Sequence, residues 1–252
     1  MINDVKIIVA MHKEYPYPED SIYLPVQVGS KVSKVDLHIQ GDDEGVNISD
    51  KNPNYCELTG IFWAWKNLQA DYLGLSHYRR YFCSNRKKSK MDSVLSQEQL
   101  EHILKKTDIV LPKKRNYYIE TNESHYIHAH HKEGWRVMIN IIQKDYPEYV
   151  DALNKMRKST KGHRFNMFIM KKEYFNCYCS WLFEILFKVE EQLDISQYSH
   201  SEARVFGYLS ERMLDVWIEA NHLKYSEVNV LFMEAQNWIK KCINFVRRKF
   251  IH

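Results

Sequence analysis

The stretch DYLGLSHYRRYF, from Asp71 to Phe82, joins a strand to a cluster of cationic and aromatic side chains. Its first half has the apolar positions of a strand buried in a protein core. Its second half places His77, Arg79 and Arg80 directly after that strand. Paired guanidiniums hydrogen bond phosphate oxygens and keep their charge when they are partly buried. The stretch therefore predicts a central strand that ends at an anion site. The alternatives are a solvated surface with structural ion pairs and, for His77, a hydrogen-bonded scaffold role.

Strands and helices alternate on both sides of this stretch, which is typical of an α/β fold with a parallel sheet. The expected strands lie over 5–13, 23–29, 71–75, 108–114 and 226–234, and residues 162–175 are expected to be a strand that runs into a helix. The expected helices lie over 55–68, 96–106, 123–156, 175–193 and 201–221. The helix over 96–106 carries its own start signal, because Ser96 and Gln99 have the spacing of a capping box.

Three polar clusters fall at the predicted carboxyl ends of strands, where open α/β sheets bind their ligands. They are His12-Lys13, the residues 77–81 and the residues 113–115. The loop over 40–55 is dense in Gly, Asp, Asn, Ser and Pro, and a long polar loop in a compact domain is usually functional. The sequence thus predicts a pocket with a basic floor, for which a diphosphate is the expected ligand.

Composition narrows the class of protein further. The chain has 252 residues, of which 44% are hydrophobic and 13% aromatic, enough for one domain with a sizeable core. A net charge of +4 suits a phosphate-bearing ligand but is too weak to indicate nucleic acid. Five scattered cysteines do not form a disulfide framework, and no signal peptide or membrane-spanning run appears. We therefore expect reduced thiols and a cytoplasmic location.

Known cofactor and metal signatures are absent from the sequence. There is no dinucleotide or P-loop glycine pattern and no GxSxG elbow. The tract HAHH at 128–131 lacks a nearby cysteine or spaced carboxylates, and Cys177 and Cys179 lack a second pair. The sequence accordingly predicts no metal and no cofactor. The missing P-loop also counts against a phosphotransferase.

Four stretches together resemble one family of bacterial capsular and exopolysaccharide glycosyltransferases, long known only as a domain of unknown function. They are NISDKNPNYCELTGIFWAWKN (47–67), DYLGLSHYRRYF (71–82), RFNMFIMKKEYF (164–175) and RVFGYLSERMLDVWI (204–218). They occur in the family's order, and the resemblance extends over about residues 6–218. It implies a GT-A-like single domain, with a central, mostly parallel sheet flanked by helices, that binds a nucleotide sugar.

The resemblance also implies a reaction. Family members include galactofuranosyltransferases, so UDP-galactofuranose is the first expected donor and UDP-galactopyranose the second. Many GT-A enzymes hold a divalent ion with an Asp-x-Asp motif where this chain has SHYRR. We therefore expect a metal-independent, inverting hexosyltransferase in which His77, Arg79 and Arg80 stabilise the leaving diphosphate. The alternative is a non-catalytic nucleotide-sugar or glycan-binding module of a polysaccharide assembly complex.

Individual site residues follow from the matching motifs. Glu211 is the expected general base, with Glu202 as the substitute, and an ion pair of Glu211 with Arg212 or Arg80 is the alternative. Asn166 is expected to hydrogen bond a sugar hydroxyl of donor or acceptor, or else to form a turn. The residues expected to bind the donor and its diphosphate are His12, Asn47, Asp50, Lys51, Tyr55, Glu57, His77, Arg79 and Arg80.

The end of the chain differs in character from the rest. The sequence predicts a domain over 1–235 and a basic amphipathic helix over 236–252, in NWIKKCINFVRRKFIH (237–252). Such a helix suits an anionic membrane surface, here the inner face of the plasma membrane, where a polyprenyl-diphosphate-linked glycan acceptor would lie. The alternative is a tail that packs on its own domain.

Overall fold

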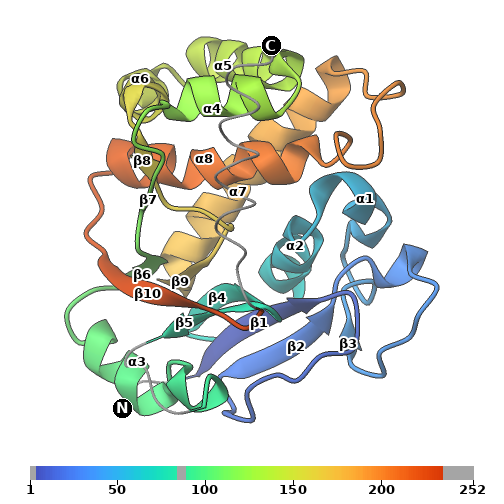
Figure 1. Cartoon of the computed structure of the whole chain (residues 1–252), viewed down its shortest axis with the longest axis vertical. Helices are drawn as coiled ribbons and strands as arrows, with labels where there is room; N and C mark the ends of the chain where they lie inside the picture. The colour runs from blue at the N-terminus through green and yellow to red at the C-terminus, as the bar shows by residue number, and fades with distance from the viewer. Residues whose placement is uncertain (1–3, 84–88, 235–252) are drawn as a thin grey trace.

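The computed structural model of the protein describes residues 4–83 and 89–234 (Figure 1). The strands are β1 (Val5–Met11), β2 (Tyr23–Gln27), β3 (Gln40–Gly41), β4 (Tyr72–His77), β5 (Arg80–Cys83), β6 (Ile109–Pro112), β7 (Arg115–Asn116), β8 (Lys161–Gly162), β9 (Phe168–Lys171) and β10 (Ser226–Phe232). The helices are α1 (Asn52–Tyr55), α2 (Leu58–Asn67), α3 (Gln97–Leu104), α4 (Asn122–Ala129), α5 (Lys132–Asp145), α6 (Val150–Lys158), α7 (Lys172–Gln192) and α8 (Val205–Ala220). The predicted α/β class is confirmed, and the expected helix over 236–252 lies outside the described residues.

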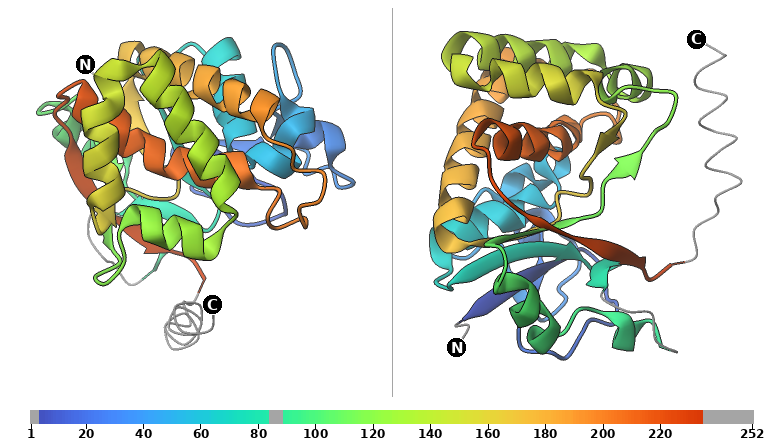
Figure 2. Two further views of the ribbon diagram at one scale, coloured as in Figure 1. Left: turned by 90° about the horizontal axis from the view of Figure 1, so that it is seen from above. Right: turned by 90° about the vertical axis from the view of Figure 1, so that its left-hand side faces the viewer.

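A mixed sheet organises the fold, with α2 and α7 on one face and α3 on the other (Figures 1 and 2). β1 pairs in parallel with β2 and β4, and β2 pairs in parallel with β3. The expectation of a mostly parallel sheet holds for this part and for the β6–β10 pair. It is wrong for β5 and β9, which run antiparallel to their neighbours. The reason is the route of the chain: β5 follows β4 through a tight turn, which permits only an antiparallel pair.

The second half of the sheet closes on itself. β4 pairs with β9, β9 with β6, β6 with β10, and β10 with β5, which returns to β4 through the pair His77 and Arg80. β4 therefore belongs both to the parallel part and to the closed ring, and its last residue, His77, is paired with both β1 and β5.

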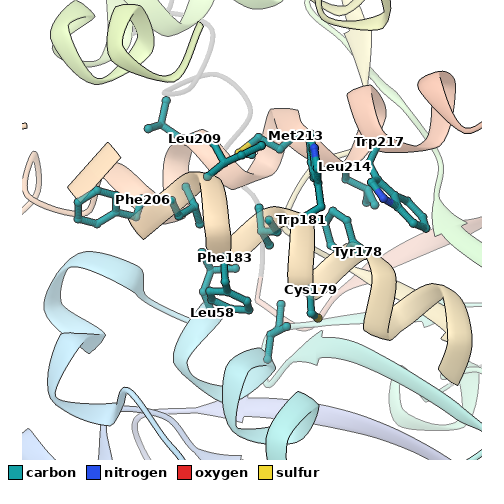
Figure 3. Close-up of a cluster of buried hydrophobic side chains, with 14 of the residues drawn as sticks. Leu58, Tyr178, Cys179, Trp181, Phe183, Phe206, Leu209, Met213, Leu214 and Trp217 are labelled. Carbon is teal, nitrogen blue, oxygen red and sulfur yellow. The ribbon is translucent and has the colours of Figure 1, made fainter. Parts of the chain in front are cut away.

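The sheet separates two apolar clusters because successive side chains of a strand point to opposite faces. On β1, Ile8 and Ala10 face the larger cluster, whereas Ile7 and Val9 face the smaller one beside α3. Side chains of α2, α7 and α8 fill the larger cluster, as Figure 3 shows for residues such as Phe183. The aromatic run of α7 is thus core. Among the described residues, no helix combines the length and apolar character needed to cross a membrane.

Local signals in the sequence fix most element boundaries. The predicted capping box forms, with Ser96 and Gln99 bonded reciprocally at the start of α3. The stretch over 40–55 is less irregular than expected, since it contains β3, a 3₁₀ turn (Ser49–Lys51) and α1. The helix predicted over 55–68 is interrupted at Cys56, whose φ of 54° separates α1 from α2.

We expect Gly74→Ala to destabilise the ring. A Cβ at position 74 would lie 2.6 Å from the carbonyl oxygen of Phe168 and 3.1 Å from the Cα of Ile169, both backbone atoms of β9. Overpacking of this kind typically lowers the free energy of unfolding by about 1–3 kcal/mol. Gly41→Ala is the matched control, because its Cβ would meet chiefly the side chains of Asp43 and Ser30. Thermal unfolding measures both, and equal melting temperatures for the two variants would contradict the expectation.

Candidate functional site

A cleft of about 410 Å³ lies beyond the carboxyl ends of the parallel strands, where the sequence predicts a pocket. One wall comes from the ends of β1 and β2 and from the turn between β4 and β5. The other comes from α1, the start of α2 and the segment that leads into α8. The ionisable residues that line it are His12, Cys56, Glu57, Arg79, His200 and Arg204. The cleft thus carries two guanidiniums and a single carboxylate among its described lining residues.

The motif SHYRR forms a two-residue hairpin turn rather than a loop. His77 pairs with Arg80 across the turn, and Tyr78 and Arg79 form its tip. This geometry separates the two arginines, which were predicted from the sequence to bind the diphosphate together. Arg79 lines the cleft, whereas Arg80 packs its guanidinium 4.7 Å from the centre of the Phe165 ring.

Arg79 has an internal anionic partner. Its Nη1 lies 3.3 Å from Oε2 of Glu234, just beyond the end of β10, and the other oxygen of Glu234 lies 3.7 Å from Nζ of Lys13. The Arg79 side chain remains 38% exposed, so the pair forms at the surface of the cleft. An exposed pair of this type contributes little to stability, and a more highly charged anion can replace the carboxylate.

Two histidines at the site, His12 and His77, favour the neutral form. Burial lowers the pKa of His12, and the nearby charges of Arg79, Lys13 and Arg204 lower it further. Burial also lowers the pKa of His77, whose Nε2 donates a hydrogen bond to the carbonyl oxygen of Phe165 at 2.6 Å. At neutral pH the positive charge of the cleft therefore comes from its guanidiniums, and His77 acts as a hydrogen-bond donor to the backbone.

Arg204 is a cleft residue that the sequence prediction missed. Its Nε donates a hydrogen bond to Sγ of Cys56 at 3.0 Å, which holds the guanidinium on the wall opposite Arg79. Burial raises the pKa of the Cys56 thiol to about 12, so the sulfur is not a thiolate. The close packing of α8 against Cys56 depends on Gly207, where a Cβ would lie 3.2 Å from Sγ of Cys56. The signal for Arg204 was available, because this residue opens the motif RVFGYLSER.

Four predicted donor residues hold the 40–55 segment in place instead of lining the cleft. Asn47 bonds the backbone of Asp43 and Gly45, and Asp50 lies 3.9 Å from Lys31. Lys51 and the hydroxyl of Tyr55 both bond Glu190 of α7, at 2.6–3.0 Å. Asp42, which the sequence prediction missed, is fully buried and accepts hydrogen bonds from Gly29, Ser30 and Ser49. These contacts fix the loop from which α1 begins.

The four predicted catalytic and sugar-binding residues also have protein partners, that of His77 being the carbonyl oxygen of Phe165. Glu211 pairs with the buried Arg212 at 3.1 Å, which is one of the alternatives the sequence leaves open. Glu202 accepts hydrogen bonds from Ser199 and lies 3.0 Å from His131. Asn166 is buried in a turn with a φ of 54°, and its amide contacts Glu57 and α8.

The remaining cationic and histidine clusters, at 113–115 and 128–131, do not line the cleft. Lys114 bonds the hydroxyl of Tyr225 at 3.0 Å, away from the cleft. Arg115 meets the 77–81 cluster at Phe165, since its guanidinium lies 5.5 Å and that of Arg80 4.7 Å from the centre of that ring. His130 stacks on Tyr208, and His131 stacks on Tyr198, so the HAHH tract supports the segment before α8. Within residues 4–83 and 89–234, no group of three or more His, Cys, Asp or Glu is placed to hold a metal ion.

Comparisons with known proteins agree with this architecture. The model of a family described as "Domain of unknown function (DUF4422)" matches residues 6–222. A solved structure described as the apo form of the bifunctional glycosyltransferase WbbM is similar, with a TM-score of 0.86 and 32% sequence identity. The match covers 92% of this chain but 46% of that chain, so the chain spans less than half of that protein. A search of curated proteins found no match. The family resemblance and the glycosyltransferase-like fold predicted from the four motifs are confirmed.

We expect the imidazole of His12 to titrate below its usual pKa of 6.5. Arg79→Gln should raise the pKa of His12, because it removes a neighbouring positive charge. Arg136→Gln, which removes an exposed guanidinium from α5, should leave it unchanged. NMR titration of the imidazole resonances, assigned with His12→Asn, provides the measurement. A midpoint at or above 6.5 in the unaltered protein would contradict this picture.

The same lowered pKa has a consequence for stability. Below pH 6.5 the unfolded state binds more protons at His12 than the folded state does. Its contribution to the free energy of unfolding is therefore fully present above pH 6.5 and is lost as the pH falls below that value. Denaturant unfolding at several pH values should show a shallower decline for His12→Asn than for the unaltered protein.

Proposed function

We propose, since the chain belongs to the family described as Domain of unknown function (DUF4422), that it is a glycosyltransferase that moves a hexose from a UDP-sugar. The observation that carries the proposal is the cleft at the strand ends, where Arg79 and Arg204 face the space in which a diphosphate would bind. The similar structure is that of a bifunctional glycosyltransferase, which supports the reaction class.

The proposed mechanism is an inverting displacement without a metal ion. As the bond between the anomeric carbon and the diphosphate breaks, negative charge develops on the leaving UDP. Fixed cations aimed at that charge stabilise the transition state. Arg79 and Arg204 supply two positive charges, equal to that of one divalent ion, from elements that the sheet and α8 hold in place. Arg80 and His77 support the turn from behind.

The finer identity of the substrates rests on the family resemblance. Galactofuranose is the first donor sugar to test and galactopyranose the second. The proposed acceptor is a lipid-linked oligosaccharide in capsular or exopolysaccharide synthesis, carried on a polyprenyl diphosphate. The basic, amphipathic character of the sequence over 236–252 supports work at the anionic inner face of the plasma membrane.

Calorimetry with UDP and a panel of UDP-hexoses tests the proposal. We expect UDP to bind in the presence of a chelator, and UDP to be released from the correct donor when an acceptor is supplied. Binding without turnover across the panel would favour the non-catalytic module. Restoration of lost activity by manganese after chelation would reject the metal-independent mechanism.

Arg79→Gln should weaken UDP binding by about 10–100-fold, the usual effect of losing a charge-assisted hydrogen bond. Arg136→Gln is the matched control and should bind UDP like the unaltered protein, because its side chain is exposed on α5. Equal affinities of all three proteins for UDP would remove Arg79 from the diphosphate site.

A further inference from the structure

Glu57 is the sole carboxylate among the described residues that line the cleft. It directly precedes α2, and its side chain is half-buried. Its negative charge acts on His77 of β4 and on Arg80 of β5, the two residues that flank the turn, and raises the pKa of each. Burial lowers the pKa of His77, and the negative charge of Glu57 is the strongest influence in the opposite direction. The carboxylate thus lies at the foot of the turn that carries Arg79.

One oxygen of this carboxylate is held by a buried amide. Nδ2 of Asn166 donates a hydrogen bond to Oε1 of Glu57 at 2.7 Å. Asn166 is itself fixed, since Oγ of Ser210 donates to its Oδ1 at 2.9 Å and its Nδ2 also contacts the carbonyl oxygen of Gly207 at 3.3 Å. Within residues 4–83 and 89–234, Oε2 of Glu57 has no hydrogen-bond or ion-pair partner. The arrangement orients one oxygen and leaves the second available.

The rival carboxylates lack this combination. Glu211 lies 3.1 Å from Arg212, a guanidinium that is 2% exposed, and Glu211 is not among the residues that line the cleft. Glu202 is held by Ser199 and His131 and does not line it either. A general base must reach the proton it removes, so access to the cleft is the first requirement.

We infer that Glu57 is the general base of the transfer and that Asn166 is the positioning residue that orients it. The inference rests on the proposed glycosyl transfer. In the step, the acceptor hydroxyl gives its proton to Oε2 of Glu57 as its oxygen bonds to the anomeric carbon. The bond from that carbon to the diphosphate oxygen breaks, and UDP leaves with the electron pair. Protonated Glu57 then returns its proton to solvent.

Water and azide distinguish a base from a residue that only binds or packs. Water must lose a proton to act as an acceptor, whereas azide is already an anion and needs no base. Each protein is incubated with UDP-galactofuranose, or with the UDP-hexose that the unaltered protein hydrolyses, and UDP release is measured with and without sodium azide. We expect Glu57→Gln to lower release to water by about 100-fold or more. It should keep UDP affinity and azide-supported release.

Three further variants sharpen the test. Glu219→Gln, a remote carboxylate that pairs with Lys155, is the matched control and should behave like the unaltered protein. Asn166→Gly keeps a residue that tolerates a positive φ but removes the amide. Asn166→Gly should reduce release to water less than Glu57→Gln does and should retain azide-supported release. Combined with Glu57→Gln in a double variant, it should add no further loss of release to water. Glu211→Gln tests the rival base, because a selective loss of release to water in this variant would assign the role to Glu211.

Each outcome has one meaning. Release to water within threefold of the unaltered protein in Glu57→Gln overturns the inference, as does an equal loss of azide-supported release or a selective loss in Glu211→Gln. Failure of the unaltered protein to release UDP from any donor of the panel when the glycan acceptor is supplied would reject the proposed function itself. Circular dichroism and melting curves of each variant separate misfolding from either result.

Discussion

Strand β4 is the element on which the rest of the molecule depends. It is hydrogen-bonded in parallel to β1, antiparallel to β9, and to β5 through its last residue. The pairing with β9 leaves no room for a side chain at Gly74, where backbone atoms of β9 approach closely. A strand restrained in this way delivers its carboxyl end to a fixed position. The turn that follows therefore presents Arg79 to the cleft with little freedom to move.

The positive charge of the cleft comes from the side chains that stay protonated when they are buried. The imidazoles of His12 and His77 are disfavoured as cations by burial. Guanidiniums keep their proton under the same conditions, so Arg79 and Arg204 carry the positive charge. The two come from opposite walls and from distant parts of the sequence. Only the fold brings them to one space, and the small residue Gly207 permits α8 to approach closely enough.

Patterns that act over short distances were predictable from the sequence. The apolar run of β1, the Ser96 capping box and the long apolar helix α7 each arise from neighbouring residues. The different positions of Arg79, in the cleft, and Arg80, on Phe165, were not predictable, because a two-residue turn points consecutive side chains in different directions. The polar residues of the 40–55 segment were expected at the ligand, but the loop needs them for its own hydrogen bonds. The Glu57–Asn166 contact joins residues 109 positions apart, and no local pattern reports such a pair.

The carboxylate of Glu234 gives the cleft a built-in counter-ion. Because Glu234 lies between Arg79 and Lys13, its single negative charge offsets only part of their positive charge before any nucleotide arrives. Docking of a diphosphate is then an exchange of one anion for another, and its apparent affinity is the difference between two pairings. The reverse exchange would assist departure of the spent nucleotide, since the carboxylate stays tethered one residue past Met233 and can reclaim its partner at once.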